Sequence, residues 1–244
     1  MIQSLIDENN TRISLRKSAL IAGIGLFIMV LTVPFAEFQI FPSLIDYKNP
    51  ATTANNLLNN KLYFTLGISL HFITLICDII VAWALYIFLK PTDKNLSLLV
   101  AWFRLIYAGI YLIALSNLIK VLGLLSAGTY FQATSQNQVY DQLLFHLKAF
   151  GYELEFGHIF FGINLCLLGY LVLKASYIPK VIGWLLVIAG LGYFITSTGN
   201  FVLPNINTDL IMVTFLGELI FMFWLLIRGG RIQKLTVKKE HETS

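Results

Sequence analysis

Charged side chains are scarce in this chain. Only 12% of its 244 residues are Asp, Glu, Lys or Arg, whereas 57% are hydrophobic. A soluble domain carries about 25% charged residues, so this composition is typical of a membrane protein. The basic residues also lie beside apolar stretches and do not gather in one patch, which argues against nucleic acid as a partner.

Cysteines and catalytic motifs are scarce as well. The two cysteines, Cys77 and Cys166, both lie within apolar stretches, so the sequence offers neither a disulfide framework nor a CxxC metal site. The chain contains no G-x-S-x-G, HExxH, Walker A or GxGxxG motif. From these motifs we predict no cofactor, no resident metal and no catalytic residue.

Long apolar stretches are what the sequence has in abundance. There are six of them, at residues 18–40, 62–89, 96–125, 146–173, 179–203 and 209–228. Each is long enough for a helix that crosses a hydrocarbon core of about 30 Å, which takes about 20 residues. We predict an all-α fold, an integral membrane bundle of six transmembrane helices within residues 18–228. Residues 1–17 and 229–244 are predicted to be cytoplasmic tails, the second of them basic.

The 17 Lys and Arg residues are divided unequally among the gaps between these stretches. Twelve lie in the two tails and the second and fourth gaps or, as Lys180 and Arg228 do, at the stretch ends that adjoin them. Only Lys48 and Lys61 lie in the other gaps, and Arg104, Lys120 and Lys148 lie within the stretches. Because cytoplasmic loops of membrane proteins are enriched in basic residues, we predict that both termini face the cytoplasm. The lipid bilayer is then the main partner of the chain.

Two opposite charges lie deep within the second and third stretches. Asp78 lies 13 residues before Pro91, where the chain turns, and Arg104 lies 13 residues after it. Antiparallel helices of equal rise bring these two side chains to the same depth. A lone charge in mid-bilayer costs about 2.5–3.5 kcal/mol, so each needs a partner. We predict an ion pair that fixes the hairpin.

The other polar residues of the stretches are concentrated toward the predicted outer side. Each of the six stretches contributes at least one of them: Glu37, His71, Lys120, Glu155, His158, Asn200 and Glu218. Ionisable groups inside a membrane usually face a water-filled cavity or each other. We therefore predict a polar cavity that is open to the outside and lined by these residues.

The fourth stretch carries a face of small and polar residues. Gly151, Glu155, His158, Gly162 and Gly169 follow steps of four, three, four and seven residues, so they share one side of a helix. Glycines on such a face allow neighbouring helices to approach closely. We expect Glu155 and His158 to point into the bundle.

Several interpretations of these polar residues stay open. The first is a non-catalytic protein that binds or moves a small ligand, an ion or a lipid through the cavity. A second is an intramembrane enzyme whose metal is held by His71, Glu155 and His158, although the Glu-x-x-His spacing occurs once and carboxylate-bridged metal bundles need it twice. A third is a structural or regulatory partner of another membrane protein, in which the polar groups only bond across helices.

Spaced Gly, Pro, Arg and aromatic residues form a recognisable pattern along the chain. They lie at 18–23, 84–91 and 101–105, and at Phe160, Gly162, Gly169, Pro179, Gly183, Gly190 and Tyr193. This pattern resembles the domain of unknown function 4386 family over about residues 12–228. The resemblance implies a multi-pass protein of the bacterial cytoplasmic membrane and matches Arg104 to an arginine of the family. It implies no activity, and the predicted cavity residues belong to no motif of that family.

Overall fold

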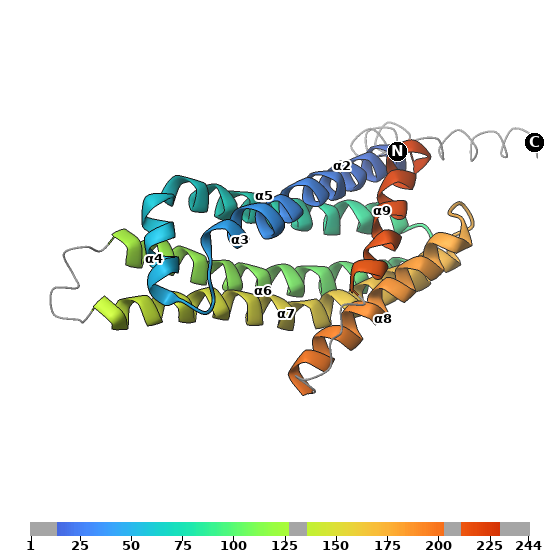
Figure 1. Ribbon diagram of the computed structural model, residues 1–244. Coiled ribbons are helices and arrows are strands. Elements are labelled where there is room, and N and C mark those ends of the chain that lie inside the picture. Colours follow the sequence, from blue (N-terminus) through green and yellow to red (C-terminus); the bar gives the residue numbers. More distant parts are fainter. Residues whose placement is uncertain (1–13, 127–135, 203–210, 230–244) are drawn as a thin grey trace, which may run out of the picture.

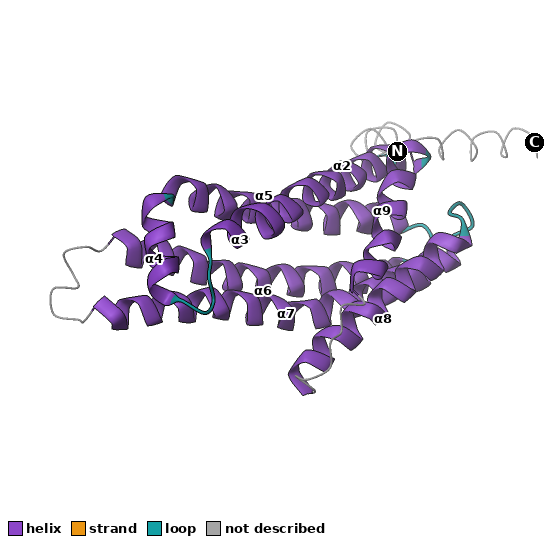
Figure 2. Cartoon of the chain, viewed as in Figure 1, coloured by secondary structure: helices purple, strands orange, loops and turns teal. Residues whose placement is uncertain are grey.

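The computed structural model describes residues 14–126, 136–202 and 211–229, and within these ranges every regular element is a helix (Figures 1 and 2). The elements are α2 (Leu15–Pro34), the π-helix η1 (Phe35–Ile40), α3 (Phe41–Leu44), α4 (Pro50–Asn59), α5 (Lys61–Leu89), α6 (Lys94–Ser126), α7 (Gln136–Lys174), α8 (Lys180–Val202) and α9 (Ile211–Ile227). The structure therefore confirms the all-α class that was predicted.

Five helical segments are long and apolar enough to cross a membrane. They are Leu15–Leu44, which joins α2, η1 and α3, and the helices Lys61–Leu89, Lys94–Ser126, Asn137–Lys174 and Lys180–Val202. The sixth predicted stretch corresponds to α9, whose described apolar part, Phe215–Ile227, is shorter. Several potential spans in one chain indicate a multi-pass membrane protein.

The helices form one bundle with α4 across one end of it. Helices α5, α6 and α7 run side by side, α2 lies along α5, and α9 packs between α2 and α8 (Figure 1). Helix α7 begins well before the apolar stretch that starts at His146, because Leu143, Leu144 and Leu147 give its first turns a buried side. These turns pack against α4, which Asn49 caps by accepting a hydrogen bond from the Thr52 backbone N–H.

The chain turns at 90–93 and 175–179 lie together, and we call this the turn end of the bundle. The Tyr177 hydroxyl donates to the backbone oxygen of Phe88 over 2.9 Å and lies 3.2 Å from the hydroxyl of Thr92. Lys174 Nζ is 2.8 Å from Asp93 Oδ2, and this hydrogen bond lowers the pKa of Asp93. These contacts place the α5–α6 and α7–α8 turns on the same side of the bundle.

Helices α7 and α8 touch through pairs of glycines. A Cβ atom on Gly162 would lie 2.7 Å from the backbone oxygen of Gly190, and one on Gly169 would lie 2.7 Å from that of Gly183. Real side chains do not approach so closely, so these positions need glycine for the two backbones to meet. The glycine face of the fourth stretch thus packs against α8.

Helix α2 changes its winding at Pro34. Proline has no backbone N–H and cannot make the usual helical bond to the fourth residue before it. The next six residues form η1, and a π-helical turn shifts the faces of the side chains that follow. Glu37 lies on η1 and reaches His71 of α5. The irregular turn therefore directs a carboxylate into the bundle.

Candidate functional site: an acidic and aromatic cavity

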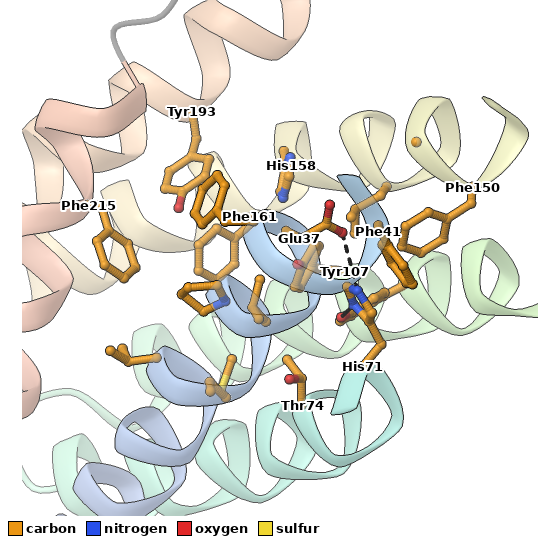
Figure 3. Close-up of a pocket in the computed structure, with 18 of the residues that line it drawn as sticks. Glu37, Phe41, His71, Thr74, Tyr107, Phe150, His158, Phe161, Tyr193 and Phe215 are labelled. Carbon is orange, nitrogen blue, oxygen red and sulfur yellow. Dashed lines mark hydrogen bonds and ion pairs between the residues drawn. The ribbon is translucent and has the colours of Figure 1, made fainter. Parts of the chain in front are cut away.

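A cavity of about 430 Å³ lies among the helices (Figure 3). Most of its lining residues on α5, α6 and α7 lie in the half of each helix farther from the turn end. Its polar lining groups come from η1 and from α5 to α9: Glu37, His71, Thr74, Tyr107, Tyr111, His158, Tyr193 and Glu218. Phe38, Phe41, Tyr47, Phe150, Phe161 and Phe215 add aromatic surface to the wall. The cavity is thus largely apolar, with a few polar groups that converge on it, as ligand sites generally are.

Glu37, His71 and Tyr111 form a polar chain across the cavity wall. His71 Nε2 lies 3.2 Å from Glu37 Oε1, and its Nδ1 lies 2.5 Å from the Tyr111 hydroxyl oxygen. A carboxylate oxygen can only accept, so the neutral imidazole that suits this contact carries its proton on Nε2, and in that tautomer Nδ1 accepts from the tyrosine. Figure 3 shows the Glu37 carboxylate directed from η1 toward His71. Nδ1 of His71 is therefore hydrogen-bonded to Tyr111, whereas Nε2 faces Glu37 at ion-pair distance without hydrogen-bond geometry.

Aromatic rings surround His71. Its imidazole stacks on Phe41 with ring centroids 5.3 Å apart, and Phe150 and Tyr111 meet it edge-on at 5.3 Å and 5.9 Å. The side chain of His71 has no exposed surface. This packing fixes the imidazole plane, so Glu37 meets a preoriented donor.

A second polar group lies across the cavity on α7, α8 and α9. The His158 ring lies between Tyr107 and Tyr193, with centroid distances of 6.0 Å and 5.4 Å. The hydroxyl of Tyr193 hydrogen-bonds the carboxyl group of Glu218. Glu218 Oε1 is buried and has no hydrogen-bond partner. This side of the cavity thus contains an acceptor that is available to a ligand.

The Asp78–Arg104 pair lies next to the cavity on the side of the turn end. Arg104 Nη2 is 2.6 Å from Asp78 Oδ1, and both side chains are buried. The guanidinium carbon lies 5.4 Å from the centroid of the Phe161 ring, which lines the cavity. Arg104 and Glu218 also line a small void of about 10 Å³, close to the volume that one water needs. The pair is therefore coupled to the cavity through Phe161 and Glu218.

The structure brings four of the seven predicted cavity residues together and leaves three outside. Glu37, His71, His158 and Glu218 line the cavity, whereas Lys120, Glu155 and Asn200 do not. Asn200 Nδ2 instead donates to Glu155 beside the cavity, and Lys120 Nζ lies 3.5 Å from Asn117 Oδ1.

The separation of Glu155 from His158 has a geometric cause. Three residues on an α-helix correspond to a rotation of about 300°, so the two side chains diverge by about 60°. Helix α7 lies between α6 and α8, and this angle is enough for His158 to meet Tyr107 of α6 while Glu155 meets Asn200 of α8. The residues share a face, as predicted, and both contact α8, but only His158 also reaches α6 and lines the cavity.

Comparison with known proteins agrees with the observed helices. A family model described as a domain of unknown function (DUF4386) matches residues 21–229. The chain belongs to this family. A relative from Archaeoglobus fulgidus, described as an uncharacterized protein, is 38% identical over 181 residues, which are 73% of this chain and 93% of that protein. No solved structure matches the chain. The match covers most of α2 and all the later described helices to α9, so the resemblance seen in the sequence is confirmed.

The described part of this DUF4386 protein offers no cluster for a metal ion. It contains no group of three or more His, Cys, Asp and Glu residues that could hold one. Glu155 bonds to Asn200, and both nitrogens of His71 already have partners. The metal-dependent alternative therefore receives no support from these residues.

Sequence reasoning missed two features of this DUF4386 protein. The tyrosines of the cavity were one, although Arg104, Tyr107 and Tyr111 follow steps of three and four residues and so share a helix face. The other is a polar cluster near the α4 end of α6 and α7. There Asn117 donates to Glu153 over 2.8 Å and lies 3.1 Å from a ring nitrogen of His146.

Proposed function

We propose that this DUF4386 protein is a six-helix integral protein of the cytoplasmic membrane that binds a small ligand, an ion or a lipid in the cavity described above. The proposal rests on one observation, the convergence of Glu37, His71, His158 and Glu218 on a cavity of about 430 Å³. Small-molecule sites usually have about 300–1,000 Å³, an apolar wall and a few polar groups. Ionisable residues inside a membrane are costly, and they commonly mark a binding site or a pathway.

The orientation follows from the charges at the turn end. Lys90, Lys94, Lys174 and Lys180 lie at its two turns, and the contact between Lys174 and Asp93 supports a common side for both. Basic turns face the cytoplasm. The cavity lies in the other half of the bundle, and on this topology it faces outward. The exposed side chains of Phe38 and Tyr47, at 70% and 52%, mark its rim.

The surroundings of His71 favour binding over metal-dependent catalysis. A metal ligand needs a free ring nitrogen, whereas Nδ1 of this buried imidazole lies 2.5 Å from the Tyr111 hydroxyl and Nε2 faces Glu37 at 3.2 Å. We therefore propose a binding protein of the membrane and not a metal enzyme.

Thiol labelling tests both the cavity and its outward opening. A Cβ atom on Gly151 would meet nothing within 4 Å, and this residue lines the cavity, so Gly151→Cys adds a thiol there without a clash. In a Cys77→Ala/Cys166→Ala background we expect a charged, membrane-impermeant methanethiosulfonate reagent to modify this thiol in intact cells. Thiols react as thiolates and need access to water.

The control is Gly109→Cys. This position is equally open, but it lies on the exposed surface of α6 and does not line the cavity, so lipid should protect its thiol. Equal reaction rates at the two positions would contradict a water-accessible cavity. Labelling of Gly151→Cys only after permeabilisation would contradict the outward opening.

A further inference from the structure

We infer that the ligand of this cavity is a small organic cation, a protonated or quaternary amine on an apolar body. This inference rests on the proposed function and adds the chemical class of the ligand. It is carried by the charge of the cavity lining, by an unpartnered carboxylate oxygen and by the aromatic wall.

The cavity lining contains more acidic than basic side chains. Two carboxylates, Glu37 and Glu218, line it, and none of the described lining residues is Lys or Arg. Arg104 lies close to Glu218, but its guanidinium is paired with Asp78 at 2.6 Å. Three carboxyl groups, Asp78, Glu37 and Glu218, thus share one permanently charged cation, Arg104, and an acidic excess remains although Arg104 also lies near Glu218. Carboxylates in a low-dielectric site need a compensating charge, which a cationic ligand would supply.

Each carboxylate keeps an oxygen that can accept a hydrogen bond from a ligand. Glu37 meets His71 through one oxygen and keeps a side chain that is 33% exposed. Glu218 is bonded by Tyr193, and its Oε1 is buried without a hydrogen-bond partner. Since the two lie on η1 and α9, on different sides of the cavity, a cation between them would be attracted from both sides.

The wall between these carboxylates is aromatic. Tyr107, Tyr193 and Phe161 pack together with centroid distances of 4.9 Å and 5.2 Å from the phenylalanine, and all three line the cavity. Ring faces attract alkylammonium groups, and the attraction grows when water is excluded. Figure 3 shows Tyr193, Phe161 and Phe215 grouped on one side of the site, with Phe41 and Phe150 on the other. A bare metal ion would leave this apolar wall without a contact.

Three probes of similar size and different charge test this inference. They are benzyltrimethylammonium, its neutral carbon analogue 2,2-dimethylpropylbenzene, and benzylsulfonate. The readout is the rate at which N-ethylmaleimide alkylates the Gly151→Cys protein, purified in detergent in the Cys77→Ala/Cys166→Ala background. We expect benzyltrimethylammonium to slow alkylation at concentrations at least about tenfold below those needed by the other two, as its coulombic attraction to the carboxylates and cation–π contacts predict.

Carboxylate variants identify the groups that recognise the charge. Glu37→Gln and Glu218→Gln keep the shape of the side chain, and each should weaken protection by the cation about tenfold while leaving protection by the neutral probe unchanged. Glu153→Gln is the matched control, since this carboxylate bonds Asn117 and does not line the cavity. An effect of Glu153→Gln equal to the others would overturn the assignment of Glu37 and Glu218.

The outcomes separate this inference from the proposal on which it rests. Better protection by the neutral or anionic probe overturns the cation assignment but leaves a ligand-binding cavity. Rapid alkylation that no probe slows also overturns it. A Gly151→Cys thiol that does not react at all in the folded protein overturns the cavity itself, and with it both proposals.

Discussion

Arg104 places a positive charge in the interior of the helix bundle. The contribution of this charge to stability depends on two carboxyl groups. Asp78 pairs with it directly, and Glu218 lies at the edge of the same small void. Removal of one partner from a buried pair leaves an uncompensated charge, which costs more than the pair contributes when intact. The arginine is shared between two acids, so its loss should be more harmful than the loss of either acid.

Arg104→Gln should lower the free energy of unfolding by about 3–5 kcal/mol, because Asp78 and Glu218 are then buried without a cation. Asp78→Asn should cost less, since Glu218 still compensates the guanidinium. Unfolding of the purified protein by SDS in mixed micelles measures both. Asp93→Asn, which removes the partly exposed contact with Lys174, is the control and should change stability by less than about 1 kcal/mol. Equal losses for Arg104→Gln and Asp93→Asn would contradict this account.

Tyr111 is expected to stabilise the protein through its hydroxyl group. Tyr111→Phe keeps the ring beside His71 but removes the donor that lies 2.5 Å from Nδ1. A buried acceptor without a partner costs about 1–3 kcal/mol, so the detergent-solubilised variant should unfold at a lower temperature. Tyr170→Phe, on an exposed side chain, should leave the unfolding temperature unchanged. If both variants unfold like the wild type, the His71–Tyr111 bond contributes nothing to stability.

At the scale of the elements, α7 and α8 approach each other closely because glycines of the two helices lie opposite one another. Gly162 meets Gly190 and Gly169 meets Gly183, each through backbone oxygens of the opposite helix. No hydrophobic force draws helices together within lipid, so this close packing holds them. The same seam fixes the rotation of α7 and therefore the direction of His158.

Gly162→Ala and Gly190→Ala should each destabilise the protein by about 1–3 kcal/mol, because the added methyl group meets backbone atoms at 2.7 Å or less. Gly123→Ala is the control on α6, where a Cβ atom meets nothing within 4 Å. It should be neutral or stabilising by up to about 1 kcal/mol through helix propensity. SDS-driven unfolding again provides the comparison, and a destabilising Gly123→Ala of the same size would refute the packing argument.

At the scale of the whole molecule, the two basic turns lie at one end of the bundle, and the cavity lies in the opposite half. Helix α4 lies across the end opposite the two turns (Figure 1). With both termini inside, α4 lies outside and the turn end lies in the cytoplasm. On this proposed orientation, the cavity would receive molecules that arrive from outside.

Two asparagines at opposite ends test this topology. Asn59 at the end of α4 and Asn95 at the start of α6 are both exposed. In the background without cysteines, Asn59→Cys should react with a membrane-impermeant maleimide in intact cells. Asn95→Cys should react only after the membrane is permeabilised. The reverse pattern would mean that the protein has the opposite orientation, with its cavity facing the cytoplasm.

The sequence by itself determined the helical class, the approximate helix limits and the membrane character. These depend on apolar length and on the distribution of charge along the chain, which are local properties. It also predicted a common depth for Asp78 and Arg104, because a short hairpin leaves little freedom in how two helices align. The structure places these side chains 2.6 Å apart.

Only the tertiary structure decided which polar groups share the cavity. The rotation of each helix depends on its neighbours, and a rotation of about 60° separates His158 in the cavity from Glu155 at α8. The π-helical turn after Pro34 sets the direction of Glu37, and side-chain periodicity along the sequence does not reveal such a turn. The depth of a side chain in the membrane could therefore be predicted from the sequence. The direction of that side chain around its helix axis is known only from the packed bundle.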